Sequence, residues 1–180
     1  MAPHSSTETR GIVYLVGAGP GSIEYLTVRA FRLLQTCEVV VYDALIDNDL
    51  LTLVADPCVQ IDVGKRGGKP SVPQQEINKI LVTYCQQHKR IVRLKSGDPF
   101  IFGRCMAEIE ALRIAGCSYE VVPGLSSALA APLLAGIPLT DPVLSQGFSV
   151  VSAHQPDALN WDALAQMDTV VILMGTRHLD

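Results

Sequence analysis

Three glycines near the N-terminus, Gly17, Gly19 and Gly21, follow the apolar run Ile12–Val16 in the stretch IVYLVGAGPGS. A strand that runs into a glycine-rich turn is the arrangement with which many α/β proteins hold a nucleotide phosphate. The dinucleotide fingerprint is GxGxxG, however, whereas these glycines are spaced GxGxG. Pro20 also lacks the backbone N–H that a pyrophosphate would need. The spacing alone therefore leaves open a structural tight turn and a nicotinamide dinucleotide site.

Asp43 is the second candidate, because it ends the apolar run VVVYD. A carboxylate at the carboxyl end of a parallel strand lies at the edge of the sheet where ligands bind. Its position is about that of the ribose-binding acid of a dinucleotide fold. The alternative is an Asx cap on the loop that follows.

The middle of the chain is strongly cationic although the protein as a whole carries a net charge of −4. Between residues 65 and 104 there are two acidic residues, Glu76 and Asp98, and nine cationic ones, for a net charge of +7. The cationic residues are Lys65, Arg66, Lys69, Lys79, Lys89, Arg90, Arg93, Lys95 and Arg104. They indicate either solvated helix and loop surfaces, as we expect for Lys79, Lys89 and Arg90, or a site for an anionic ligand. Nucleic acid is disfavoured as that ligand, because the protein is acidic overall and lacks interleaved aromatic residues.

Other functional classes find little support in the composition. The five cysteines are odd in number and none forms a CxxC pair, which favours a reducing compartment and hence a cytoplasmic protein. The four histidines are far apart, so no metal site is expected. No apolar run is long enough to span a bilayer, and residues 1–11 resemble a disordered tail rather than a signal sequence.

Short β-branched runs alternate with helical patterns along residues 12–142. The expected strands are Ile12–Val16, Val39–Tyr42, Val59–Val63, Ile91–Lys95 and Tyr119–Val122. The apolar residues between Ile77 and Cys85 follow the helical period, and Ser71, Pro73 and Gln74 make a plausible start for that helix. A further helix contains Ile109 and Leu112 and stops at Gly116. The alternation predicts an α/β domain with a parallel sheet and helices on both faces.

A second block follows the proline- and glycine-rich junction AGIPLTDPVLSQG. Phe148–Ser152 and Thr169–Met174 are expected strands, with a short helix within residues 157–166. We therefore place a domain boundary near residue 143 and interpret residues 143–180 as the first part of a second α/β domain. This block is too short to bury a core by itself, so it is expected to be incomplete here or to pack onto the first domain.

The order of six segments is more informative than any one of them. The segments are VYLVGAGPGS…LT, VVVYDALI, VGKRGGKPSVPQQEIN, RLKSGDPFIFGR, VVPGLSSALAAPLLAGIPLT and VILMG. Together they closely resemble the tetrapyrrole methylase superfamily, the class III methyltransferases, over Ile12 to about Gly175. The GKR…VPQ…EIN and RLK-GDPF-FGR segments resemble the branch that methylates uroporphyrinogen III.

The resemblance implies an enzyme that transfers methyl groups from S-adenosylmethionine (SAM) to uroporphyrinogen III. The implied reaction gives precorrin-2 through precorrin-1 by methylation at C2 and C7, on the way to sirohaem or cobalamin. In this family the glycine loop forms one wall of the cleft that holds folded SAM between two α/β domains. The family also implies a homodimer without a metal. The eight substrate carboxylates suit the cationic segment.

The resemblance also assigns roles to individual residues. Asp43 aligns with the proton acceptor of the family and Lys65 with its proton donor. The implied SAM contacts are Pro20, Ser96, Gly97, Asp98, Ile101, Ser126, Ser127 and Met174. We add Arg66 and Arg104 as candidates for substrate carboxylates, because arginine binds a carboxylate bidentately. Simpler alternatives are a surface lysine for Lys65, a helix N-cap for Ser126 and Ser127, and core packing for Met174.

Three departures from the family pattern qualify these assignments. Ser96 replaces a glycine, so its side chain is expected to crowd SAM or to strain the backbone if the position needs a positive φ. Cys105 and Met106 replace two glycines beside the expected tetrapyrrole cleft, which puts the fit of the substrate in question. The strands that follow in the family's second domain have no counterpart here, so a non-catalytic member is a further hypothesis beside the methyltransferase and the dehydrogenase.

Overall fold

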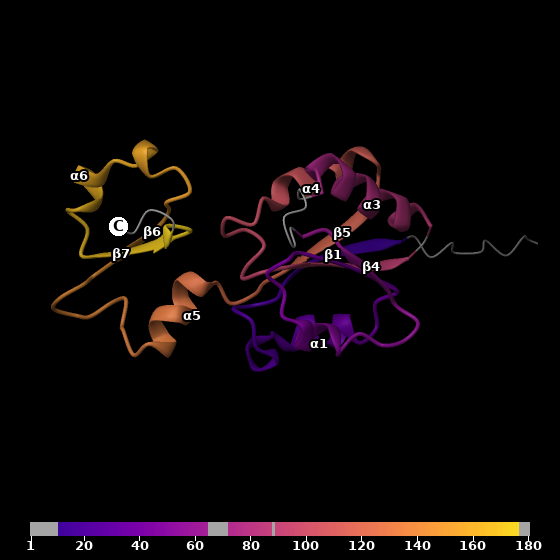
Figure 1. Ribbon diagram of the computed structural model, residues 1–180, viewed down its shortest axis with the longest axis horizontal. Helices are drawn as coiled ribbons and strands as arrows, with labels where there is room; N and C mark the ends of the chain where they lie inside the picture. Colours follow the sequence, from indigo (N-terminus) through magenta and orange to yellow (C-terminus); the bar gives the residue numbers. More distant parts are fainter. Residues whose placement is uncertain (1–10, 65–71, 88, 177–180) are drawn as a thin grey trace, which may run out of the picture. The chain divides into compact units, whose positions relative to one another are not determined.

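The computed structural model describes residues 11–64, 72–87 and 89–176, and Figure 1 shows their arrangement. The chain forms two compact units, Met1–Leu125 and Ser126–Asp180. The predicted boundary near residue 143 lies inside the second unit. The assignment of residues 143–180 to a domain of their own stays a prediction.

A parallel sheet of five strands forms the centre of the first unit, in the order β3-β2-β4-β1-β5. The strands are β1 (Ile12–Gly17), β2 (Val39–Tyr42), β3 (Val59–Asp62), β4 (Arg90–Lys95) and β5 (Ser118–Val122). The central strands are rich in valine, isoleucine and leucine, because both faces of a covered parallel sheet are buried. The predicted α/β fold is therefore confirmed, and the strand ends differ from the predicted bounds by at most one residue.

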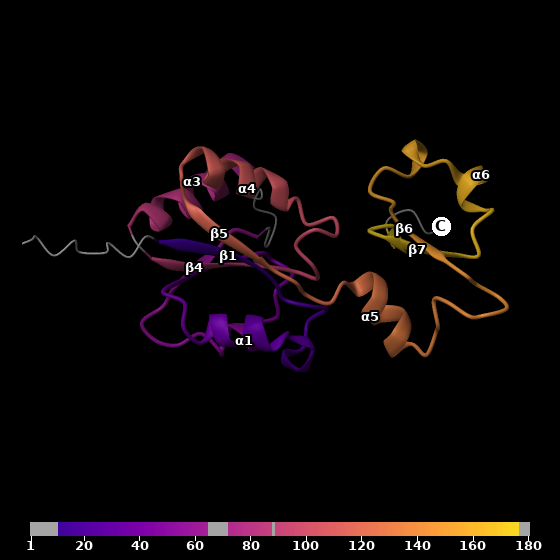
Figure 2. The same cartoon turned by 180° about the vertical axis from the view of Figure 1, so that it is seen from behind.

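Helices cover both faces of this sheet, as Figures 1 and 2 show from opposite sides. The helices α3 (Gln74–Gln86) and α4 (Cys105–Ile114) lie on one face, where Ile77, Leu81 and Leu112 join the buried core. The other core contains residues of α1 (Val28–Leu34) and α2 (Asn48–Leu51). A short 3₁₀ helix, η1 (Ile23–Tyr25), follows the glycine loop. Each face of the sheet thus has its own apolar core.

The helix α3 begins at Gln74, one of the residues predicted to mark its start. Pro73 is the N-cap residue and no side chain caps the helix, while Ser71 lies outside the described residues. The fixed φ of proline favours this position, where a missing N–H costs nothing. Proline thus marks the start of α3 without a side-chain cap.

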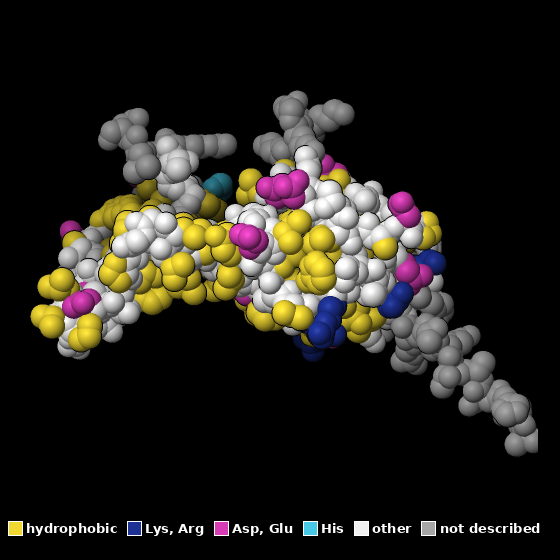
Figure 3. Space-filling view, turned by 90° about the horizontal axis from the view of Figure 1, so that it is seen from below, with side chains coloured by type: hydrophobic (Ala, Val, Ile, Leu, Met, Phe, Trp, Pro, Cys, Tyr) yellow, Lys and Arg dark blue, Asp and Glu magenta, His cyan; other side chains and the backbone are white. Residues whose placement is uncertain are grey.

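The second unit contains one helix and a pair of parallel strands. The helix α5 (Ser127–Leu134) precedes β6 (Phe148–Ser152) and β7 (Thr169–Leu173), which pair along their full length. The connection between the strands holds η2 (Pro156–Ala158) and α6 (Trp161–Leu164), where a short helix was predicted. Apolar side chains gather on the face of this unit in Figure 3, and α5 itself exposes leucines.

Candidate active site

The topology of the first unit marks one point on the carboxyl edge of the sheet. The chain leaves β2 towards β3 at one outer edge, whereas it leaves β4 past β1 towards β5 at the opposite edge. The connections from the neighbouring strands β2 and β4 therefore diverge. Ligands of open α/β sheets bind outside the strand ends at such a switch point. The residues at the ends of β2 and β4 are therefore the candidates for contact with a ligand.

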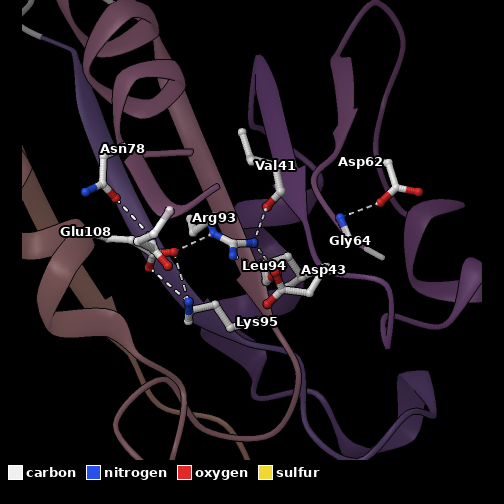
Figure 4. Close-up of polar contacts among 10 residues, drawn as sticks. Val41, Asp43, Asp62, Gly64, Asn78, Arg93, Leu94, Lys95 and Glu108 are labelled. Carbon is white, nitrogen blue, oxygen red and sulfur yellow. Dashed lines mark hydrogen bonds and ion pairs between the residues drawn. The ribbon is translucent and has the colours of Figure 1, made fainter. Parts of the chain in front are cut away.

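Asp43 and Arg93 meet at this point. Arg93 lies on β4 and is only 2 % exposed, while the side chain of Asp43, directly after β2, is 34 % exposed. The arginine donates a hydrogen bond from Nη2 to Oδ1 of Asp43 over 2.5 Å. Its Nη1 donates to the carbonyl oxygens of Val41 and Leu94 at 3.4 and 3.2 Å (Figure 4). The candidate base is therefore a partly exposed carboxylate held by a buried guanidinium.

Glu108 joins the same cluster from α4 and is fully buried. Its Oε1 accepts hydrogen bonds from Nε of Arg93 at 2.9 Å and from Nζ of Lys95 at 3.0 Å, and its Oε2 accepts a second bond from Lys95 at 3.0 Å. Figure 4 shows the side chains converging from β4 and α4. We call Asp43, Arg93, Lys95 and Glu108 the charge quartet, in which two carboxylates balance two cations.

The electrostatics of the quartet favour a charged Arg93. Burial lowers the pKa of its guanidinium, but the carboxylates of Asp43 and Glu108 raise that pKa by more, so it ends above its ordinary value. Buried charges are stable only when they are paired and hydrogen-bonded in this way. Arg93 therefore acts as a fixed cation beside Asp43.

The glycine loop forms part of a main-chain surface beside the quartet. Gly19 and Gly97 exchange two backbone hydrogen bonds, of 3.2 and 2.9 Å, which join the loop after β1 to the end of β4. A Cβ atom on Gly124 would lie 2.2 Å from the carbonyl oxygen of Gly97, and one on Gly17 would lie 2.6 Å from the same atom. Gly17 and Gly124 are therefore needed for close backbone approach between the strand ends.

Asp98 and Ser96 follow β4. Both carboxylate oxygens of Asp98 accept backbone hydrogen bonds, from Phe100 at 2.8 Å and from Gly124 at 3.2 Å. Ser96 is half-buried and is not among the described residues with a positive φ, so the strain expected from a serine there does not arise. Gly97 takes the positive φ instead, at 69°. The predicted SAM contacts of these three residues stay predictions.

The remaining residues predicted to bind SAM are divided between the two units. Pro20 is half-buried in the glycine loop, and Ile101 is exposed in the loop after β4. In the second unit Ser126 is the N-cap of α5, where its Oγ accepts from the N–H of Ala128 at 3.2 Å, and Ser127 is exposed. Met174 is 52 % exposed with a φ of 60°, so it is not a buried core residue. Their roles in binding SAM stay predictions.

The loop that leads into α4 presents an apolar hollow with one arginine. The hollow measures ≈ 370 Å³ and is lined by Gln74, Pro99, Phe100, Phe102, Gly103, Arg104, Cys105, Met106 and Ala107. Arg104 is exposed at the N-cap of α4 with a φ of 52°. Cys105 is buried, so of the two residues that replace glycines only Met106 reaches the surface.

Some of the predicted residues cannot be placed. Lys65 and Arg66 lie outside the described residues, as does Lys69. Among the described residues no group of three or more histidine, cysteine, aspartate or glutamate side chains is arranged to hold a metal ion. Within that same part of the chain, no helix is both long and apolar enough to cross a bilayer.

Sequence reasoning missed the role of Arg93, Lys95 and Glu108. It counted the two cations only in the charge of the cationic segment, yet both are buried and paired. Lys89 and Arg90 also have a partner, Glu38. The segment therefore presents less positive charge to a ligand than its composition suggests. A signal was available, because two cations spaced by two residues on a buried strand must share one face and need an acidic partner.

Fold and site together define an open α/β protein with a candidate ligand site at the carboxyl edge of its sheet, and comparisons with known proteins identify the family. The model of the Tetrapyrrole (Corrin/Porphyrin) Methylases matches residues 12–180. The uroporphyrinogen-III C-methyltransferase of Synechococcus elongatus is 63% identical over 169 residues, which are 94% of this chain and 70% of that protein. The siroheme synthase of Sodalis glossinidius is 46% identical over 97% of this chain and 38% of its own length.

A solved structure agrees with these relatives. The uroporphyrin-III C-methyltransferase of Thermus thermophilus, complexed with S-adenosylhomocysteine, is 41% identical with a TM-score of 0.76. The match covers 92% of this chain and 66% of that one. The chain belongs to the tetrapyrrole methylase family, and the predicted membership is confirmed. It spans little more than a third of siroheme synthase.

Proposed function

We propose that this chain methylates uroporphyrinogen III with SAM, giving precorrin-2 by way of precorrin-1. The observation that carries the proposal is the charge quartet at the switch point of a tetrapyrrole methylase fold, which presents a fixed carboxylate beside a main-chain wall. The 63% identity to a uroporphyrinogen-III C-methyltransferase supports it. The names of the relatives connect the reaction with sirohaem synthesis, and cobalamin synthesis is the second route that the product would serve.

The residues after β1 and β4 suit SAM as the methyl donor. Gly17 and Gly124 pack so tightly against the carbonyl oxygen of Gly97 that neither has room for a Cβ atom, so this wall consists of main chain alone. The structural neighbour that holds S-adenosylhomocysteine supports this assignment. When bound, SAM supplies an electrophilic methyl group on sulfur. We assign contacts with SAM to Pro20, Ser96, Gly97, Asp98, Ile101, Ser126, Ser127 and Met174.

Asp43 would remove the proton that the methylated ring must lose. Its Oδ1 is held by Arg93, and Oδ2 accepts no hydrogen bond from the described residues. The carboxylate is thus oriented while one oxygen stays available, as a general base requires. We assign the complementary donor to Lys65, which lies outside the described residues.

The hollow before α4 would receive part of the tetrapyrrole. Exposed Phe100, Phe102 and Met106 offer apolar contact, and Arg104 offers a cation at its rim. The substrate combines apolar ring surface, which would pack on the apolar residues, with carboxylate side chains, which Arg104 could bind. Arg66 would bind a further carboxylate. A homodimer and a cytoplasmic location complete the proposal.

The dehydrogenase alternative is not favoured. Asp43 would have to bind a ribose, yet one of its oxygens is bound by Arg93. Calorimetric titration with S-adenosylhomocysteine and with NADH tests the choice directly. Binding of S-adenosylhomocysteine alone, together with SAM-dependent conversion of uroporphyrinogen III followed by absorbance and mass, supports the methyltransferase. Binding of NADH without methyl transfer would overturn it.

A further inference from the structure

Glu108 is a carboxylate that is fully buried in an apolar core. It lies on the face of α4 that also carries Cys105, Ile109 and Leu112, all part of the buried core. Its two oxygens together accept three hydrogen bonds, all from Arg93 and Lys95. Stability alone does not account for such a cluster, because a buried ion pair can often be replaced by apolar residues at no cost.

The guanidinium of Arg93 connects Glu108 with Asp43, because it donates a hydrogen bond to each carboxylate. The group is planar and its N–H directions form a rigid fork. Glu108 holds Nε, the carbonyl oxygens of Val41 and Leu94 hold Nη1, and Nη2 then points at Oδ1 of Asp43 (Figure 4). We propose that Glu108 is a positioning residue for Asp43, which acts through Arg93. This inference rests on the proposed methyl transfer with Asp43 as its base.

Glu108 also restrains Lys95. The strand register pairs Leu94 with Tyr42, so Lys95, the last residue of β4, lies at the level where Asp43 follows β2. Lys95 donates two hydrogen bonds to Glu108 and none to Asp43. Without the carboxylate of Glu108, a buried ammonium would need another acceptor, and Asp43 lies at the same level of the neighbouring strand. Glu108 thus keeps one oxygen of the base free.

The test compares Glu108→Gln with Glu110→Gln. Both residues lie on α4, but the side chain of Glu110 is 61 % exposed and forms a surface ion pair with Arg113. We expect Glu108→Gln to lower kcat by about 10- to 100-fold, the scale of a misplaced catalytic group. The KM for uroporphyrinogen III and the affinity for S-adenosylhomocysteine should stay within about twofold of the wild type, as should every parameter of Glu110→Gln. An unchanged kcat in Glu108→Gln overturns the inference.

A double-mutant cycle with Asp43→Asn separates positioning from a general structural role. If Glu108 acts through Asp43, Asp43→Asn/Glu108→Gln should turn over no more slowly than Asp43→Asn alone. Additive losses of kcat would overturn the inference. Should Glu108→Gln fail to fold, the cycle is repeated with Glu108→Gln/Lys95→Met in its place, because that pair removes one charge of each sign.

A crystal structure of Glu108→Gln, or of Glu108→Gln/Lys95→Met if that variant is the one that folds, gives a readout that does not depend on turnover. We expect the bond between Arg93 and Asp43 to be broken or displaced. An Asp43 that keeps its wild-type position would overturn the inference even if the protein proves to have another activity. Failure of the wild type to methylate uroporphyrinogen III would instead overturn the proposed function, so the two failures are distinguishable.

Discussion

Arg93 on β4 donates a hydrogen bond to Asp43 after β2, with 2.5 Å between Nη2 and Oδ1. The two residues are 50 positions apart in the chain and meet only because β2 and β4 are neighbours in the sheet. The pair gives the candidate base a single orientation at the switch point, and the first prediction follows from it.

Replacing Asp43 by asparagine should lower kcat by roughly 10²-fold or more, the scale of a lost general base. The amide oxygen can still accept a bond from Arg93, so the variant should fold and bind S-adenosylhomocysteine. Steady-state kinetics and calorimetry measure the two effects. Loss of S-adenosylhomocysteine binding together with turnover would make Asp43 a ligand of the cofactor instead of the base.

Arg104→Ala should raise the KM for uroporphyrinogen III about tenfold or more, because a charge-assisted hydrogen bond contributes roughly 1.5–3 kcal/mol. Arg66→Ala should behave similarly. Lys79→Ala and Arg90→Ala, measured at the same ionic strength, are the controls. Added salt should weaken substrate binding more than SAM binding, because an anion with eight carboxylates is screened more strongly. Equal effects of all four substitutions would indicate only diffuse attraction.

Ser96→Gly should be tolerated and should tighten SAM binding a few-fold. Ser96 adopts no positive φ, so glycine relieves no strain there and the gain would come from closer backbone approach. Thermal unfolding should show little change or a slight loss of stability. A clear fall in SAM affinity, measured by calorimetry, would instead make the Ser96 hydroxyl a contact.

Gly124→Ala should lower the free energy of unfolding by roughly 2–3 kcal/mol, a typical cost of overpacking. The new Cβ would lie 2.2 Å from the carbonyl oxygen of Gly97, which cannot move without shifting β4. Gly147→Ala is the control, because a Cβ there meets nothing within 4 Å. Urea denaturation compares the two, and a neutral Gly124→Ala would contradict the close packing of the strand ends.

The buried thiols should react slowly with iodoacetamide. Burial raises the pKa of Cys37 to about 12 and that of Cys105 to about 11, so at pH 8 only about one molecule in 10³–10⁴ carries either thiolate. In the unfolded chain these thiols ionise near the ordinary value of 9.0. The free energy of unfolding should therefore fall as the pH rises from 9 towards 12. Mass spectrometry after alkylation, with the guanidinium-unfolded protein as control, measures the reactivity, and rapid labelling of the folded protein at pH 8 would contradict the burial.

Much of the fold was predictable because each strand and helix can be recognised from the pattern of its own residues. The run Val39–Tyr42 consists of three β-branched valines and a tyrosine, and the helical period of α3 is visible between Ile77 and Cys85. The strand order was not predictable, since it depends on which helix crosses which face. The start of α3 was predictable to within a few residues, because Pro73 and Gln74 belong to the pattern that marked it.

The candidate site was predictable only in part. Asp43 could be found from its place after a strand. Glu108 could not be assigned in the same way. An acidic residue on a helix with other charged residues is normally predicted to face solvent. Its partners are 13 and 15 residues away, and only the packing of α4 on β4 brings them together.

The charge quartet also constrains the order in which the chain can fold during synthesis. β4 becomes a central strand between β1 and β2, yet it carries Arg93 and Lys95 on the face that α4 covers. A nascent chain that has emerged only as far as Lys95 lacks the carboxylate that both cations need, so burying that face would leave them incompletely paired. Closure of the sheet must therefore wait until Glu108 has left the ribosome, and truncated chains that end within the loop before α4 should remain open and prone to aggregation.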